Sequence, residues 1–211
     1  MKRVSCPAVV TLMAFFGVEL LAQSAVPTPT RTIAFSEGRI FVDGQMVDST
    51  TGPVPLRKGF LVRTEDGRAE VTLDGGTILF LGNHSSVREI DDRFSDPQGL
   101  EMLSGSAVLW TRGAKAAMQC EDRVTLFEFG IFRFDFNPSV PRNIDDVCSF
   151  KVFGGTAWVY LASLRSSLAE GKRMGLNRHC GDMLPTYDFD TAARDDMDRW
   201  SLARMRLRDG R

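Results

Sequence analysis

The chain has 211 residues, of which 43% are hydrophobic and 25% are charged, and its formal net charge is −1. This composition is that of a globular protein with a substantial core, and it excludes a disordered chain. The near-neutral charge gives no bulk electrostatic support to nucleic-acid binding, so we expect no nucleic-acid partner.

The N-terminal 24 residues (1–24) have the organisation of an export signal. Lys2 and Arg3 form a charged start, Ala8–Val18 is an apolar run, and small residues lead up to Ser24. The run of about eleven residues is shorter than the roughly 18–20 that a bilayer requires. We therefore predict cleavage after Ser24 and a periplasmic or secreted product with no stable membrane span. An uncleaved membrane anchor is the alternative.

Residues 25–30 contain two prolines and predict a flexible leader. Residues 31–161 predict one β-rich domain, because polar and apolar side chains alternate in short runs such as Arg68–Leu73. Glycine-containing turns separate the runs, for example Asp74-Gly75-Gly76 and Gly154-Gly155. The total of about ten to twelve short strands is typical of an all-β sandwich, barrel or roll.

Two runs carry the clearest information about the core. Thr77–Leu81 is apolar on both faces, which predicts a strand in the middle of the domain. In Ile131–Phe136 three phenylalanines share one face, opposite an arginine and an aspartate. We expect these side chains, Phe132, Phe134 and Phe136, to be buried together.

The C-terminal part follows a different pattern. Residues 162–189 are mixed and predict an irregular segment at the edge of the sheet, in which Lys172–Leu176 is the best candidate for a further strand. Residues 190–208 place apolar side chains at helical spacing and predict an amphipathic helix, capped by Asp190 or Thr191. We expect this helix to dock on the β domain, because Trp200 would otherwise be exposed. A contact with a partner is the alternative.

A repeated frame of turn and core residues occupies residues 56–110. It reads LRKGFLVRTEDGRAEVTLDGGTILFLGNHSSVREI, followed by LEMLSGSAVLW, and it resembles the FecR domain. The matching positions are Gly59, Thr64, Asp66, Gly67, Asp74, Gly76, Leu81, Gly82, Ser85 or Ser86, and Gly105. These are turn and core positions, so we expect them to have structural roles. An extra glycine after Asp74 departs from the frame.

The resemblance implies a stacked antiparallel β-roll or sandwich. The best-known FecR proteins are transmembrane regulators, with a cytoplasmic segment that controls a sigma factor and a periplasmic domain that responds to an outer-membrane receptor. Only a few residues precede the apolar run of this chain. We therefore expect a FecR-like envelope module without the cytoplasmic anti-sigma segment.

The sequence predicts no catalytic, cofactor or metal site. The two histidines, His84 and His179, lack the paired spacing of a tetrahedral metal site. There is no Gly-x-Ser-x-Gly elbow and no phosphate-binding glycine loop. We therefore expect a protein that is not an enzyme.

Cysteines remain at three positions beyond the export signal: Cys120, Cys148 and Cys180. In an oxidising compartment we predict a Cys120–Cys148 disulfide, which leaves Cys180 as the odd thiol. We expect both paired cysteines to begin alternating runs, and a flat three-stranded meander would hold them about 9–10 Å apart. A bridge therefore implies strands that stack on each other. Two buried free thiols are the alternative.

Two functional hypotheses follow. The first is a non-catalytic exported FecR-like binding or scaffolding protein of the bacterial cell envelope, with an envelope protein as partner and a role in envelope signalling. The second is a secreted module that binds cell-wall glycan or another polysaccharide, which would require exposed aromatic side chains above a polar rim. The candidates for a partner surface are Trp110, Trp158, Tyr160 and Trp200. Packing in the core or in a hairpin is the competing explanation for each.

Overall fold

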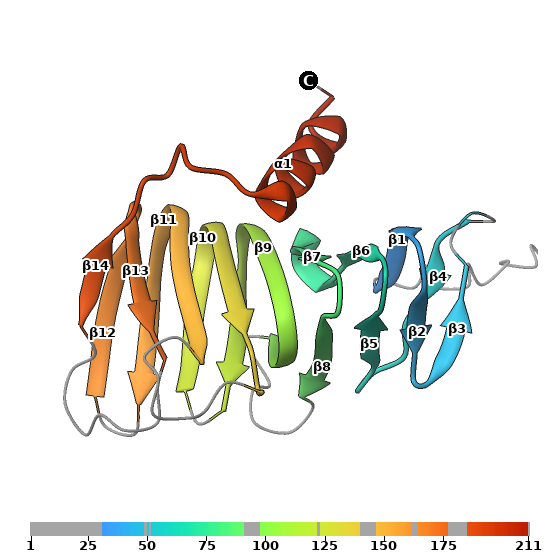
Figure 1. Cartoon of the computed structure of the whole chain (residues 1–211), viewed down its shortest axis with the longest axis horizontal. Coiled ribbons are helices and arrows are strands. Elements are labelled where there is room, and N and C mark those ends of the chain that lie inside the picture. Colours follow the sequence, from blue (N-terminus) through green and yellow to red (C-terminus); the bar gives the residue numbers. More distant parts are fainter. Residues whose placement is uncertain are drawn as a thin grey trace, which may run out of the picture.

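The computed structural model describes residues 31–48, 50, 52–90, 98–121, 123–139, 147–161, 164–176 and 185–210. Its architecture is a roll of antiparallel strands with one helix on the outside (Figure 1). The predicted all-β class with a C-terminal helix is therefore confirmed. The predictions for residues 1–30, for His179 and for Cys180 lie outside the described residues.

Fourteen strands within the described residues join in one hydrogen-bonded sheet. In chain order they are β1 (Thr32–Glu37), β2 (Ile40–Val42), β3 (Gln45–Val47), β4 (Val54–Pro55), β5 (Leu61–Thr64), β6 (Arg68–Thr72), β7 (Ile78–Leu81), β8 (Ser86–Ile90), β9 (Gln98–Cys120), β10 (Arg123–Phe136), β11 (Cys148–Leu161), β12 (Leu164–Ala169), β13 (Lys172–Gly175) and β14 (Thr186–Asp188). A 3₁₀ turn, η1 (Asp74–Gly76), joins β6 to β7, and helix α1 (Asp196–Arg208) follows β14. The count exceeds the expected ten to twelve, because residues 162–189 contain three strands at or beside the edge of the sheet.

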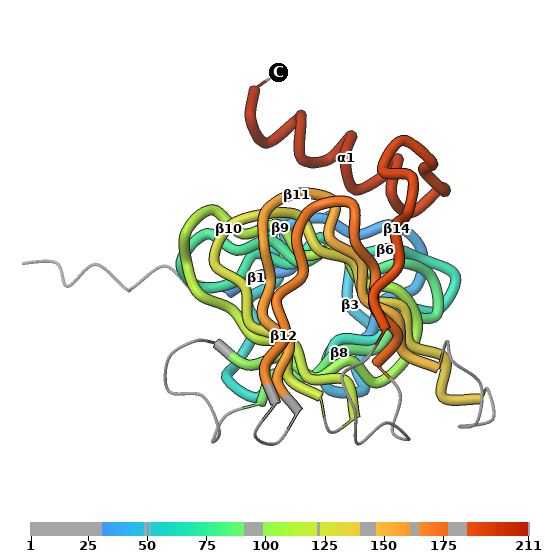
Figure 2. The backbone as a smooth tube through the Cα atoms, turned by 90° about the vertical axis from the view of Figure 1, so that its left-hand side faces the viewer, coloured from blue at the N-terminus to red at the C-terminus, as the bar shows by residue number. Residues whose placement is uncertain are grey.

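The three longest strands, β9, β10 and β11, bend so that each contributes to two sides of the roll. The first part of β9 pairs with β8, where Ser104 lies opposite Ser86. Its middle part pairs with β7, where Leu109 lies opposite Leu79. Figure 2 shows the resulting course of the chain, which winds around a common interior. The stacked arrangement that the sequence predicted is therefore present.

Glycines mark the bends of these strands. Gly155 has a φ of +86°, and a Cβ at this position would lie 2.1 Å from the carbonyl oxygen of Phe129 in β10. Gly130 approaches from the other strand, and its Cβ would lie 2.2 Å from the carbonyl oxygen of Gly154. The prediction of a hairpin turn at Gly154-Gly155 is wrong. Strand β11 continues through the pair and remains hydrogen-bonded to β10 on both sides.

The bend of β10 also explains the disulfide. Cys120 lies opposite Arg123 at one end of β10, and Cys148 lies opposite Phe136 at the other end. Folding the strand over the interior brings the two cysteines to a Cα–Cα distance of 6.8 Å, and they form the predicted disulfide. The expectation that both cysteines begin strands is wrong, because Cys120 is the last residue of β9.

The inner faces of the strands form one main apolar core. Phe132 and Phe134 are fully buried and Phe136 is nearly so, as predicted. Phe132 stacks on Phe127 with ring centroids 4.9 Å apart, and Phe134 lies 4.7 Å from Phe150. This aromatic cluster fills the space between the two sides of the roll.

Strand β7 is buried on both faces, which confirms the prediction of a central strand. Leu79 and Leu81 point into the main core. Ile78 and Phe80 point outward, where they join a second apolar cluster with α1. The helix therefore supplies the second layer that a strand without a polar face requires.

Residues of the FecR-like frame have structural roles in the roll. The buried hydroxyl of Thr64 donates to the carbonyl of Gly82 at 2.5 Å and accepts from the backbone N–H of Ser85 at 2.9 Å. The Ser85 hydroxyl accepts from the N–H of Ser106 in β9, also at 2.9 Å. A Cβ at Gly105 would lie 2.4 Å from the Ser85 Oγ, so this crossing requires glycine. These contacts link β5, β9 and the turn after β7.

The remaining frame positions are turn and ion-pair residues. Gly59 and Gly76 both have positive φ, and a Cβ at Gly67 would lie 2.3 Å from the carbonyl oxygen of Glu37. The Asp66 carboxylate is exposed and accepts from Arg39 at 2.6 Å, which lowers the pKa of Asp66. The carboxylate of Asp74 pairs with Arg31. None of these positions converges on a reactive group.

Candidate functional site

Helix α1 begins later than predicted. It starts at Asp196, not at residue 190, and its N-cap is Asp195, not Asp190 or Thr191. The Asp195 carboxylate accepts from the backbone N–H of Asp198 at 2.9 Å, and the Asp198 carboxylate accepts from the N–H of Asp195 at 3.3 Å. This reciprocal capping box satisfies two backbone donors that the helix itself cannot.

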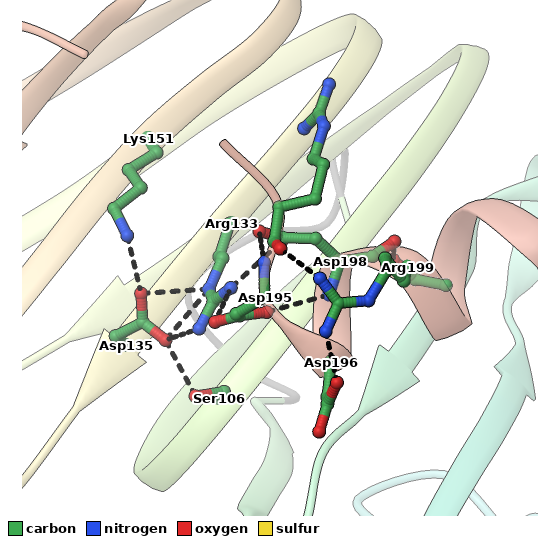
Figure 3. Close-up of polar contacts among 10 residues, drawn as sticks. Ser106, Arg133, Asp135, Lys151, Asp195, Asp196, Asp198 and Arg199 are labelled. Atoms are coloured by element: carbon green, nitrogen blue, oxygen red, sulfur yellow. Dashed lines mark hydrogen bonds and ion pairs between the residues drawn. The ribbon is translucent and has the colours of Figure 1, made fainter. Parts of the chain in front are cut away.

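The same two aspartates attach the helix to the sheet (Figure 3). Arg133 of β10 is 6% exposed, and its Nη1 lies 2.6 Å from Asp195 and 2.9 Å from Asp198. Its Nη2 lies 2.8 Å from Asp135, which also accepts from the Ser106 hydroxyl at 2.6 Å. Burial alone would lower the pKa of Arg133, but the carboxylates around it raise the pKa above its ordinary value. Arg133 therefore remains charged and holds three carboxylates together.

The C-terminal half of α1 has a second anchor. Glu70 of β6 is fully buried, and Arg204 and Arg208 of the helix both donate to its carboxylate, Arg204 at 2.8 Å. Arg112 of β9 pairs with Asp209 just beyond the helix. Both ends of the helix are thus attached by ion pairs to strands that lie far away in the sequence.

Two of the four predicted surface aromatics lie at the contact between this helix and the sheet, Trp200 on the helix and Trp110 on β9. Trp200 packs edge-on against Phe80 with ring centroids 5.8 Å apart, and Trp110 belongs to the same apolar cluster. The helix buries Met197, Ser201 and Met205, which lie four residues apart on one face. The prediction that the helix docks on the β domain is confirmed, and Trp110 and Trp200 contribute to this contact.

The other two aromatics, Trp158 and Tyr160, meet in a cleft of about 290 Å³ on the outside of the roll. They project from the second half of β11, where Trp158 lies opposite Leu126 and Tyr160 lies opposite Val124 of β10. Trp158 remains 38% exposed. The cleft is completed by residues of β9, β10 and β12: Lys115, Ala116, Leu126, Phe127, Glu128 and Arg165.

Arg165 determines the electrostatics of this cleft. Its guanidinium lies 3.6 Å from the ring centroid of Trp158 and 5.7 Å from that of Tyr160. Lys115 and Glu128 face each other across the cleft at 3.6 Å and balance each other's charge. Within the described residues, no carboxylate pairs with Arg165. The cleft can therefore hold an apolar group and an anionic group side by side.

A second, more polar cleft of about 430 Å³ lies near the turn after β7. Its lining includes Asn83, His84, Ser104, Asp135 and Asn137. The His84 ring is exposed and lies 3.7 Å from Asp66. Among the described residues, no three His, Cys, Asp or Glu side chains are grouped as a metal would require, and no helix there has the length and apolar character to cross a membrane.

The roll is similar to two crystal structures of a putative anti-sigma factor from Parabacteroides distasonis ATCC 8503, at 2.50 and 1.65 Å resolution. The TM-score is 0.50 for both, with 17% and 16% sequence identity. Each match covers 62% of this chain and 60% of the other chain, so the chain spans less than two thirds of those proteins. At this identity the likeness concerns the fold alone. No family model and no curated protein matches the sequence.

Proposed function

We propose that this protein is an exported, non-catalytic FecR-like binding or scaffolding protein of the bacterial cell envelope, with an envelope protein as its partner. The observation that carries the proposal is the exposed group of Trp158, Tyr160 and Arg165. Tryptophan, tyrosine and arginine are the residue types that contribute most to protein–protein binding. Here they stand together on strands of a bonded sheet, where little conformational entropy is lost on association.

Three further observations support the compartment and the role. A disulfide inside the roll suits an oxidising compartment. The fold neighbours are described as anti-sigma factors, which agrees with a role in envelope signalling. The frame residues around Thr64 and Gly105 hold β5, β9 and the turn after β7 together, which agrees with structural roles for them.

An affinity experiment tests the proposal. The purified protein is used as bait in an envelope extract, in parallel with a W158A/Y160A variant whose fold is verified by circular dichroism. We expect the wild type to retain one or a few envelope proteins and the variant to lose them. Capture of no protein by the wild type would refute the proposed function.

Glycan binding is the second candidate, because aromatic side chains line a cleft with a polar rim. One feature argues against it. Arg165 covers one face of the Trp158 indole, and a sugar could stack on that face only after Arg165 had moved. Sedimentation with purified peptidoglycan separates the two functions, since glycan retention without a protein partner would favour the second.

A further inference from the structure

We infer that the cleft around Trp158 and Arg165 docks a protein segment that presents a carboxylate beside an apolar side chain. The inference rests on the proposed function and specifies the chemistry of its partner. Three features support it. The cleft has an apolar platform, Arg165 beside it has no anionic counterpart among the described residues, and both lie on one side of the roll.

The platform consists of two cross-strand rows on the outer face. One row contains Leu126 and Trp158, and the neighbouring row contains Val124, Tyr160 and Arg165. Side chains directly opposite each other in antiparallel strands have Cβ atoms about 5 Å apart, so the rows form a continuous surface. An apolar side chain of a partner could rest on this surface beside the Trp158 face that Arg165 covers, and would exclude water from the apolar groups around it.

The charge of Arg165 indicates which group of the partner should lie beside that apolar side chain. Lys115 and Glu128 neutralise each other at the rim, whereas Arg165 lies over two aromatic rings and forms no ion pair within the described residues. Stacking fixes the plane of the guanidinium and leaves the N–H groups at its edge able to donate in a fork. A carboxylate matches this fork with two parallel hydrogen bonds, so an Asp or Glu side chain is the complementary group.

The molecule offers a matched comparison at another place on the sheet. Arg173 lies 5.5 Å from the ring of Tyr187, and the two residues are opposite each other in β13 and β14. Tyr187 is 49% exposed, and Arg173 lies opposite Lys151 in β11, so a second cation stands in this row where Leu126 or Val124 stands beside Trp158 and Tyr160. Substitutions at Arg173 therefore control for the loss of an exposed arginine on an aromatic ring.

Selection from random peptides displayed on phage tests the inference and does not require an identified partner. The full exported chain is immobilised as wild type, R165E, R165Q, W158A and R173E, with thermal melting to confirm that each variant folds. We expect the wild type and R173E to enrich peptides in which Asp or Glu neighbours an apolar residue. The selected peptides, measured by fluorescence anisotropy, should bind R165E and W158A at least about 10-fold more weakly than the wild type. R165Q keeps the packing and loses the charge, so it should also weaken binding.

Three results would overturn the inference: enrichment without acidic residues, binding that R165E leaves unchanged, or no enrichment at all. Retention on purified peptidoglycan that W158A abolishes would overturn it in favour of a glycan site. These failures are distinguishable from failure of the proposed function. If the envelope extract yields a protein whose binding is insensitive to R165E and W158A, the function stands and this site is wrong.

Discussion

Replacing Arg133 by methionine should release the N-terminal end of helix α1 from the roll. The substitution leaves Asp198, whose side chain is only 5% exposed, without its cation. Removing one partner of a buried ion pair costs about 3–5 kcal/mol, because the other charge remains buried and unpaired. Asp195 is 53% exposed and Asp135 retains Lys151 at 3.6 Å, so each adds at most about 1 kcal/mol. We expect R133M to lose at least about 3 kcal/mol of unfolding free energy.

Urea titration followed by tryptophan fluorescence measures this loss. Trp200 of the helix packs on Phe80 of β7, so its emission should shift to longer wavelength when the helix leaves the sheet. The control is R199M, because Arg199 forms an exposed pair with Asp196 within the helix and should change stability by less than about 0.5 kcal/mol. A loss below about 1 kcal/mol in R133M, with unchanged emission, would show that the Arg133 ion pairs do not hold the helix.

Further predictions concern the disulfide, a bend and acid stability. A double serine variant at Cys120 and Cys148 should lose roughly 3–4 kcal/mol of unfolding free energy, since the bridge closes a loop with a sequence separation of 28. Equal stability of the oxidised wild type and this variant in urea would contradict the prediction. The G155A variant should lose more than about 2 kcal/mol of unfolding free energy in a urea titration, because its Cβ meets a backbone oxygen. The control is G171A, which has positive φ but open space around the new Cβ and should lose only about 1 kcal/mol. Burial alone would raise the pKa of Asp195, but the Asp198 N–H and Arg133 lower this pKa below its ordinary value of about 4. The ionised Asp195 carboxylate therefore stabilises the fold above about pH 4, and this stabilisation is lost as the pH falls below that value. Melting temperatures of D195N should therefore fall less steeply than those of the wild type as the pH decreases below about 4.

Alternation of side chains predicted the β-rich domain and the buried face of β10. The three phenylalanines of β10 alternate with polar residues, and period two is the geometric property of a strand. The Cys120–Cys148 pairing was also predicted correctly, although the argument for it placed both cysteines at the starts of strands and Cys120 ends β9. The period of a strand is a property that each segment carries by itself.

The bends were not predictable, because a glycine pair has the same local conformational freedom in a hairpin turn and in a strand that turns a corner. At Gly155 the close approach to Phe129 in the neighbouring strand determines that the chain bends within a strand. This contact exists only in the assembled sheet. Arg165 was missed for a similar reason. It lies in β12, and only the pairing of this strand with β11 places it on Trp158.

The division of the four aromatics into two pairs is the feature that favours a binding role. Trp110 and Trp200 are accounted for by the helix, because α1 covers the outer face of β7 and they share its apolar cluster. Trp158 and Tyr160 have no such cover within the described residues, and β12 lies on a different side of the roll from α1 (Figure 2). Helix α1, held by buried charges, covers one apolar face. The second apolar face is bordered by Arg165, which forms no ion pair with a carboxylate among the described residues. This second face is therefore suited to another molecule. Binding should therefore depend on Trp158 and Arg165 and should be independent of the ion pairs that hold α1.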